Sequence, residues 1–131
     1  MAPNPPPDPF VLRGHATDVQ CVSFDARFGA RALETGDADG VVKLWDVRTV
    51  TEIGTIHVST HPVNKVCFDR SGTRIVCAGD DGLVHGYSTD DLSSVLWSVR
   101  GHEDAVQGVC FDPADTLLVS TSTDCTFRIW S

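Results

Sequence analysis

The chain repeats one pattern of residues three times, and this repetition constrains its fold more than any other feature. In each copy a valine is followed five residues later by a phenylalanine and then an aspartate: Val19, Phe24 and Asp25; Val63, Phe68 and Asp69; Val106, Phe111 and Asp112. Later in each copy an aspartate precedes an aromatic residue by six positions: Asp39 and Trp45; Asp81 and Tyr87; Asp124 and Trp130. Because a period of roughly 40 to 45 residues is the length of a unit of four short strands, the chain is predicted to be a repeat protein.

Each copy predicts short strands separated by turns, and no helix. The predicted strands span residues 19–24, 31–35, 41–45, 52–58, 63–68, 74–77, 83–87, 95–99, 106–111, 117–120 and 126–130, with a further short strand over 10–13. Runs such as VQCVSF and VQGVCF are apolar on both faces, which is typical of strands packed between neighbouring sheets. Turn signals such as Ser71-Gly72 recur at short intervals, and no window has the apolar periodicity of a helix. The predicted fold class is all-β.

The composition fits one repeat domain preceded by a tail. Residues 1–9 contain five prolines, which favour a flexible extended segment, and residues 10–131 form the predicted repeat domain, with repeats at about 12–50, 56–91 and 99–131. A hydrophobic content of 41% suffices for a core.

The net charge limits the class of ligand. With 10 basic against 18 acidic residues the net charge is -8, which argues against nucleic acid or an anionic membrane surface as the main ligand.

The five cysteines are odd in number and form no CxxC pair, so we expect free thiols packed in a reducing compartment. The N-terminus is proline-rich instead of apolar, and an intracellular protein without a signal peptide is therefore predicted.

The repeated pattern resembles the WD40 repeat, whose four-stranded blades form a β-propeller. The resemblance covers nearly the whole chain after Pro9, and three repeats imply a partial propeller or half of a six-bladed dimer. It also implies a hydrogen-bonded set in each blade, made by a His before the first strand, a Ser or Thr, a turn Asp and a Trp. Two copies carry the complete set: His15, Thr35, Asp39 and Trp45; His102, Ser120, Asp124 and Trp130. The second copy keeps only Asp81, so we expect its network to be incomplete and its blade to be the most pliable.

Elementary chemistry supports a structural role for this set, because a buried aspartate needs donors such as an imidazole N–H, a hydroxyl and an indole N–H. A hydrolase triad is the alternative interpretation of His, Ser or Thr and Asp. Against it, the set occurs twice at the same spacing and no G-x-S-x-G motif is present. His57 and His61 lie four apart without a third metal ligand, and no phosphate-binding glycine loop occurs. We therefore predict no enzyme activity, no metal and no cofactor.

A closer resemblance within the family concerns four sequence strings. They are similar to the last three repeats of the sperm-associated antigen 16 family: GDADGVVKLWDVRTVTEI, HPVNKVCFDRSGT, RGHEDAVQGVCFDP and the final TFRIWS. Those are WD-repeat proteins of the bridge between the two central microtubules of motile cilia. The resemblance implies a non-catalytic scaffold in the axoneme, located in the cytoplasm and cytoskeleton. The opening PPPDPFVLRGH resembles instead the ASTRA-associated protein 1 family, which implies a general adaptor in complex assembly. A general fold does not fix function, so an enzyme stays the remote third alternative.

The predicted partners are proteins, including a second copy of the chain. Loops on one face of a propeller carry five acidic residues, and we predict that this face binds basic or polar partners: Asp18, Asp37, Asp80, Glu103 and Asp104. Three blades cannot close a ring. A two-fold dimer is therefore expected, in which residues 10–13 of each copy complete the last blade of the other.

Overall fold

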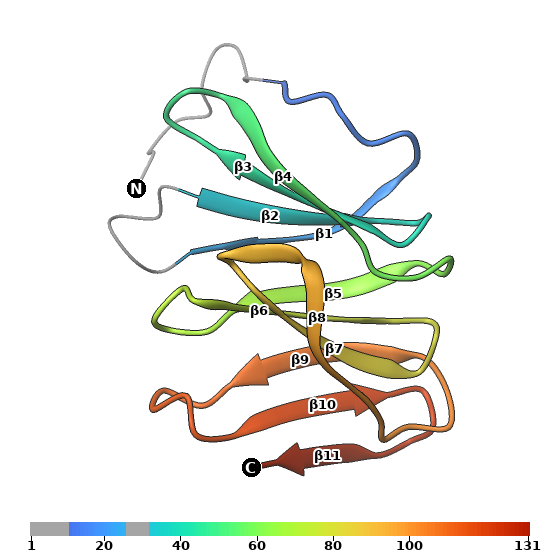
Figure 1. Ribbon diagram of the computed structural model, residues 1–131. Helices are drawn as coiled ribbons and strands as arrows, with labels where there is room; N and C mark the ends of the chain where they lie inside the picture. The colour runs from blue at the N-terminus through green and yellow to red at the C-terminus, as the bar shows by residue number, and fades with distance from the viewer. Residues whose placement is uncertain (1–10, 26–31) are drawn as a thin grey trace, which may run out of the picture.

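The computed structural model describes residues 11–25 and 32–131, and these residues fold into three antiparallel sheets, which we number as blades. Blade 1 contains β1 (Val19–Phe24), β2 (Ala32–Asp37), β3 (Val41–Asp46) and β4 (Thr51–His57). Blade 2 contains β5 (Val63–Phe68), β6 (Arg74–Gly79), β7 (Leu83–Ser88) and β8 (Asp91–Arg100). Blade 3 contains β9 (Val106–Phe111), β10 (Leu118–Ser122) and β11 (Phe127–Trp130). The sheets are stacked face to face in chain order, with β1–β4 at one end and β11 at the other (Figure 1).

The all-β prediction is confirmed, and each of the eleven strands predicted from residue 19 onward is present within a few residues of its expected bounds. The largest difference is β8, which begins at Asp91 instead of residue 95. The prediction of a strand over residues 10–13 is wrong for its described part, because residues 11–13 form no strand. These residues have no paired neighbour, and a strand depends on the hydrogen bonds of an adjacent strand. Phe10 and the proline-rich segment 1–9 lie outside the described residues.

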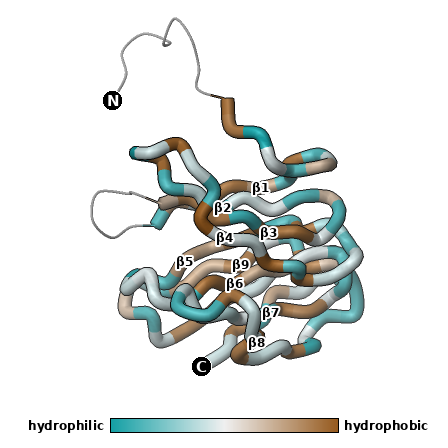
Figure 2. Tube along the Cα trace, turned by 45° about the horizontal axis from the view of Figure 1, so that its top comes forward, coloured by the Kyte–Doolittle hydropathy of each residue, from teal (hydrophilic) through white to brown (hydrophobic). Residues whose placement is uncertain are grey.

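Two apolar clusters fill the spaces between the blades. The cluster between blades 1 and 2 contains Val42, Leu44, Ile56, Val63, Val66, Ile75, Cys77 and Tyr87. The cluster between blades 2 and 3 contains Val76, Ala78, Val84, Val106, Val109 and Leu118. Apolar stretches follow the strands and polar stretches follow the turns (Figure 2). Blade 2 thus buries both of its faces, whereas blades 1 and 3 each bury one, and this explains why its strands read as continuous apolar runs.

The turns between the second and third strand of each blade share one backbone conformation. Gly40, Gly82 and Cys125 occupy the same position, and their φ angles are 86°, 76° and 72°. Glycine adopts this left-handed region without cost, whereas a side chain at Cβ makes it unfavourable. A Cβ on Gly40 would also lie 2.1 Å from the carbonyl oxygen of Ser59, so this position has no room for a side chain. Cys125 takes the same turn under strain.

Within the described ranges no helix is long and apolar enough to cross a lipid bilayer.

Candidate functional site

A chain of polar side chains crosses blade 1. The Trp45 indole N–H donates to Thr35 Oγ1 at 2.9 Å. On its other side, the Thr35 hydroxyl lies 2.5 Å from His15 Nε2. His15 Nδ1 in turn lies 2.7 Å from Asp37 Oδ2. If His15 Nδ1–H donates to the Asp37 carboxylate and Nε2 accepts from the Thr35 hydroxyl, each of these four side chains has a hydrogen-bond partner.

The aspartate of this network is Asp37, and the prediction of Asp39 is wrong. Thr35 and Asp37 are two residues apart on β2, so both side chains point to the same face, toward His15. Asp37 Oδ1 also accepts from the backbone N–H groups of Asp39 and Val41, at 2.9 and 3.0 Å. Burial acts to raise the pKa of Asp37, but these hydrogen bonds and the one from His15 outweigh it and hold the pKa below its ordinary value. Asp39 is exposed at the tip of the turn.

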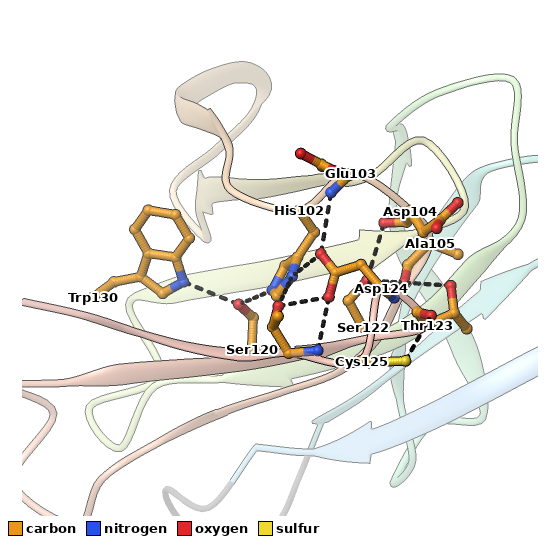
Figure 3. A network of polar contacts seen from close by, with 11 residues as sticks. His102, Glu103, Asp104, Ala105, Ser120, Ser122, Thr123, Asp124, Cys125 and Trp130 are labelled. Atoms are coloured by element: carbon orange, nitrogen blue, oxygen red, sulfur yellow. Dashed lines mark hydrogen bonds and ion pairs between the residues drawn. The ribbon is translucent and has the colours of Figure 1, made fainter.

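Blade 3 assembles the corresponding chain from the four predicted residues. The Trp130 indole N–H donates to Ser120 Oγ at 3.0 Å, and Ser120 Oγ lies 2.7 Å from His102 Nε2. His102 Nδ1 lies 3.0 Å from Asp124 Oδ2, which also accepts from the Glu103 N–H (Figure 3). The Thr126 hydroxyl donates a hydrogen bond to Asp124, and this bond is the main reason why the pKa of Asp124 is well below its ordinary value. Burial acts to raise this pKa, and the hydrogen bond from His102 lowers it further.

Blade 2 has a different network, which the sequence analysis missed. His85 Nε2 lies 2.8 Å from Asp81 Oδ2, and His85 Nδ1 lies 2.7 Å from Ser98 Oγ. Burial acts to raise the pKa of Asp81, but the hydrogen bonds from His85 and from the Leu83 N–H outweigh it. His85 lies on β7, at the position that Lys43 holds in β3. A histidine at this position of the repeat is the feature of the sequence that could have predicted the pair with Asp81. The usual set is thus incomplete in blade 2, as expected, but Asp81 is paired with His85, a partner that the repeat pattern did not predict.

These networks are built for internal satisfaction of polar groups. Ser120 is completely buried and His102 is 2% exposed, so no substrate carbonyl could contact the hydroxyl. The hydroxyl is also engaged on both sides, by the indole and by the imidazole. Buried polar chains of this kind specify one arrangement of a blade. Among the described residues no group of three His, Cys, Asp or Glu side chains could hold a metal ion.

A second missed residue is Glu34, a buried acid between blades 1 and 2. It is 0% exposed, and neither carboxylate oxygen has a hydrogen-bond partner among the described residues. Burial raises the pKa of Glu34 well above its ordinary value, and the charge of Asp25 raises it further. Val76 and Val119 occupy the same position in the other two repeats, so alignment of the repeats reveals the exception.

The loops that carry the predicted acidic face are joined in pairs, one pair in each blade. Within each blade, the loop before the first strand is tied to the turn after the second by one backbone hydrogen bond: Ala38 N to Asp18 O at 3.0 Å, Asp80 N to Pro62 O at 3.0 Å, and Thr123 N to Ala105 O at 3.1 Å. The β2–β3, β6–β7 and β10–β11 turns lie along one edge of the stack (Figure 1).

Four of the five predicted acidic side chains are exposed at this edge: Asp18, Asp80, Glu103 and Asp104. Asp37 does not belong to the surface, because it is 2% exposed and bound to His15. Asp39 is exposed there instead. Asn64 Nδ2 donates to Asp80 Oδ1 at 2.8 Å and to the Val106 carbonyl at 3.0 Å, which joins blades 2 and 3 below this surface. We define the acidic edge as Asp18, Asp39, Asp80, Glu103 and Asp104.

Antiparallel sheets of four, four and three strands, stacked face to face and each with an internal network of His, hydroxyl and Asp groups, are typical of the blades of a β-propeller. The sequence profile of the family described as "WD domain, G-beta repeat" matches residues 9–46, 51–88 and 93–131. The chain belongs to the WD40 repeat family. The crystal structure of the RRP9 WD40 repeats superposes with a TM-score of 0.85 over 92% of this chain and 37% of that one, at 22% identity, and shows the same fold.

Several curated proteins are similar to the chain. Periodic tryptophan protein 1 homolog of Drosophila melanogaster is 33% identical over 92% of this chain and 27% of its own length. Human striatin-4 is 31% identical over 92% of this chain and 19% of its own. Histone acetyltransferase type B subunit 2 of Candida glabrata is 36% identical over 86% of this chain and 26% of its own. The chain thus spans about a fifth to a quarter of these relatives. Their diverse names support a WD40 protein-interaction scaffold, and none of them indicates the axonemal central apparatus.

Proposed function

We propose that this chain is a non-catalytic scaffold that holds a basic segment of another protein against the acidic edge. The observation that carries the proposal is the fixed set of loops: each is tied by a backbone hydrogen bond to its neighbour, so the exposed carboxylates stand on a rigid platform. A rigid surface loses little conformational entropy when a partner binds. Exposed charges of one sign steer a partner of the opposite sign and set the salt dependence of association.

Charge reversal at this edge tests the proposal. The probe is a set of immobilised Lys- and Arg-rich peptides, and the readout is binding of the full chain at low and at physiological salt. We expect the double variant Asp39→Lys, Asp104→Lys to bind more weakly and with a flatter salt dependence. The control is Asp90→Lys, Asp91→Lys, which makes the same change of net charge at exposed positions where β8 begins, on the opposite edge (Figure 1). Equal loss of binding in both variants, or no loss in either, would contradict a role for the acidic edge.

A finer proposal concerns the cell compartment. We infer that the protein is intracellular and is a component of the ciliary or flagellar axoneme central apparatus, and the support is the likeness of the strings HPVNKVCFDRSGT and TFRIWS to axonemal WD-repeat proteins. The tagged chain expressed in a ciliated cell should then fractionate with demembranated axonemes. Co-purification with cytoplasmic assembly factors, and absence from axonemes, would favour the adaptor role instead.

A further inference from the structure

Glu34 points into the contact between blades 1 and 2, which we call the first joint. Ser23 on β1 and Leu44 on β3 lie directly opposite Glu34 in the sheet. Directly opposite residues of antiparallel strands point to the same face, and Leu44 belongs to the apolar cluster of this joint. The strand β1 of blade 1 lies beside β5 of blade 2 there (Figure 1). The Glu34 side chain is therefore enclosed between two sheets.

The contact between blades 2 and 3, which we call the second joint, carries a valine at the same place. Val76 matches Glu34 in the repeat, is 1% exposed and belongs to the apolar cluster of the second joint. Glu34 is as completely buried as Val76, although it can ionise. The two joints are thus built alike and differ in one ionisable group.

The groups around Glu34 do not stabilise a charge on it. Neither of its carboxylate oxygens has a hydrogen-bond partner among the described residues. The ring nitrogens of His85, which is on the facing side of blade 2, are already engaged by Asp81 and Ser98. The titratable groups that face the first joint or interact electrostatically with Glu34 are Cys21, Asp25, Cys67, Cys77, His85 and Tyr87.

The basic side chains on the neighbouring strands are held elsewhere. Lys43 on β3 and Arg74 on β6 each form an ion pair with an acid of their own blade. Lys65 on β5 lies opposite Ala78, which belongs to the cluster of the second joint. Among the described residues, no positive charge therefore compensates an ionised Glu34.

An ionised carboxylate without a partner is unstable in such a place, because burial of a charge costs far more than burial of a neutral polar group. Glu34 can keep a charge only where water reaches it. Opening of one joint exposes less surface than unfolding of the whole chain, so it is the less costly way to hydrate the carboxylate. The second joint has Val76 at this place and gains nothing from opening.

We propose that Glu34 makes the first joint a pH-sensitive switch, which is closed while the carboxyl is protonated and opens to water once the carboxyl is ionised. In the closed form burial raises the pKa of Glu34 well above its ordinary value, and in the open form hydration restores it. Between these two pKa values the closed form binds one more proton than the open form. Rising pH therefore favours the open form about tenfold per pH unit, until the pH passes the raised pKa.

Labelling of the individual cysteines in the full chain tests the switch. Cys77 is 0% exposed in the first joint, and burial raises its pKa well above the ordinary value, so its thiol reacts only when this joint opens. Cys67 packs against the cluster of the second joint and reports on that joint. Cys110 is exposed and gives the intrinsic rate of labelling at each pH. The probe is a small thiol-specific disulfide reagent at low concentration, used from pH 5 to pH 8, with peptide mass spectrometry as the readout.

In the parent chain, the labelling rate of Cys77 divided by that of Cys110 should rise about tenfold per pH unit above pH 5. The same ratio for Cys67 should stay constant. Glu34→Gln is the matched control, because glutamine keeps the shape but cannot ionise, and Glu34→Val copies the second joint. Both variants should remove the rise, and either one suffices if the other fails to fold.

Two results would overturn the proposal. A Cys77 ratio with the same pH profile in the parent and in the variants would show that Glu34 does not control the joint. Labelling of Cys67 in step with Cys77 would show that the whole chain unfolds instead of one joint. Urea provides an independent check, since opening of one joint should depend weakly on urea and unfolding strongly. A Cys77 rate with the full urea dependence of unfolding would refute local opening.

Discussion

Replacement of Glu34 by valine should stabilise the protein, and increasingly so as the pH rises. Glu34 is completely buried between blades 1 and 2 without a hydrogen-bond partner among the described residues, while valine occupies the same position in the other two repeats. A buried polar group left without a partner costs about 1 to 3 kcal/mol even when it is neutral. The smaller valine leaves some space unfilled, which offsets about 1 kcal/mol of that gain. At acidic pH we therefore expect a net gain of about 1 kcal/mol.

The pH dependence follows from the raised pKa of Glu34. The unfolded chain releases this proton near the ordinary glutamate pKa of 4.5, whereas the folded protein retains it to higher pH. Between the two pKa values the folded state binds one more proton, so its stability falls as the pH rises, by about 1.4 kcal/mol per pH unit. The stabilising contribution is complete below 4.5 and is lost as the pH passes through the raised pKa. The valine variant lacks this slope, and its advantage over the parent grows across the window.

Urea unfolding of both proteins from pH 4 to pH 8 measures the effect. Glu34→Gln is the matched control, because glutamine keeps the shape and the unpaired polar atoms but cannot ionise. We expect Gln to remove the slope without the gain at low pH, and Val to give both. A parent and a valine variant with parallel pH profiles would show that Glu34 is solvated or paired in solution, and the argument from its burial would fail.

Three further predictions concern the turns and networks. Asp37→Ala should lower the free energy of unfolding by roughly 1 to 3 kcal/mol, because it leaves buried donors unpaired. Asp39→Ala should lower it little, and equal losses of thermal stability would show that Asp39 belongs to the network. Cys125→Gly should raise the unfolding free energy by about 1 kcal/mol, since glycine removes the strain of the left-handed turn; an unchanged or lower value would speak against strain. The pKa of Asp124 is lowered, so its contribution is present above the ordinary value of 3.8 and lost as the pH falls below it. Asp124→Asn should flatten the acid limb of the stability curve, and an unaltered acid limb would count against this.

The repeat alignment predicted the strands well because the three copies support one another. A run such as Val63–Phe68 is ambiguous alone, but its recurrence in register leaves one interpretation. The alignment placed Asp39 in the network, because Asp39 matches Asp124, whereas in blade 1 the acid that pairs with the histidine is Asp37, at the end of β2. It failed over residues 11–13, which form no strand because no described strand pairs with them.

His85 and Glu34 show a different limit of the sequence analysis. Both are departures from the repeat, at positions where the other copies carry a different residue type, and a search for what the copies share passes over them. His85 restores a network in the blade that lacks the usual histidine. Glu34 introduces an unpaired acid. Departures from a repeat therefore carry information about the individual blade that the shared pattern does not contain.

The covering of blade 2 on both faces has a consequence for the order in which the chain unfolds. In stacked repeats each unit is held by its neighbours, so among the described residues blade 2, which is covered on both faces, is expected to open after blades 1 and 3. The amides of β6 and β7 should accordingly exchange with solvent most slowly among the described strands, although this blade carries Tyr87 where the other two carry a tryptophan. This reverses the expectation from the repeat pattern that blade 2 is the most pliable. Protection from exchange would then follow the place of a blade in the stack more closely than it follows the match of that blade to the repeat pattern.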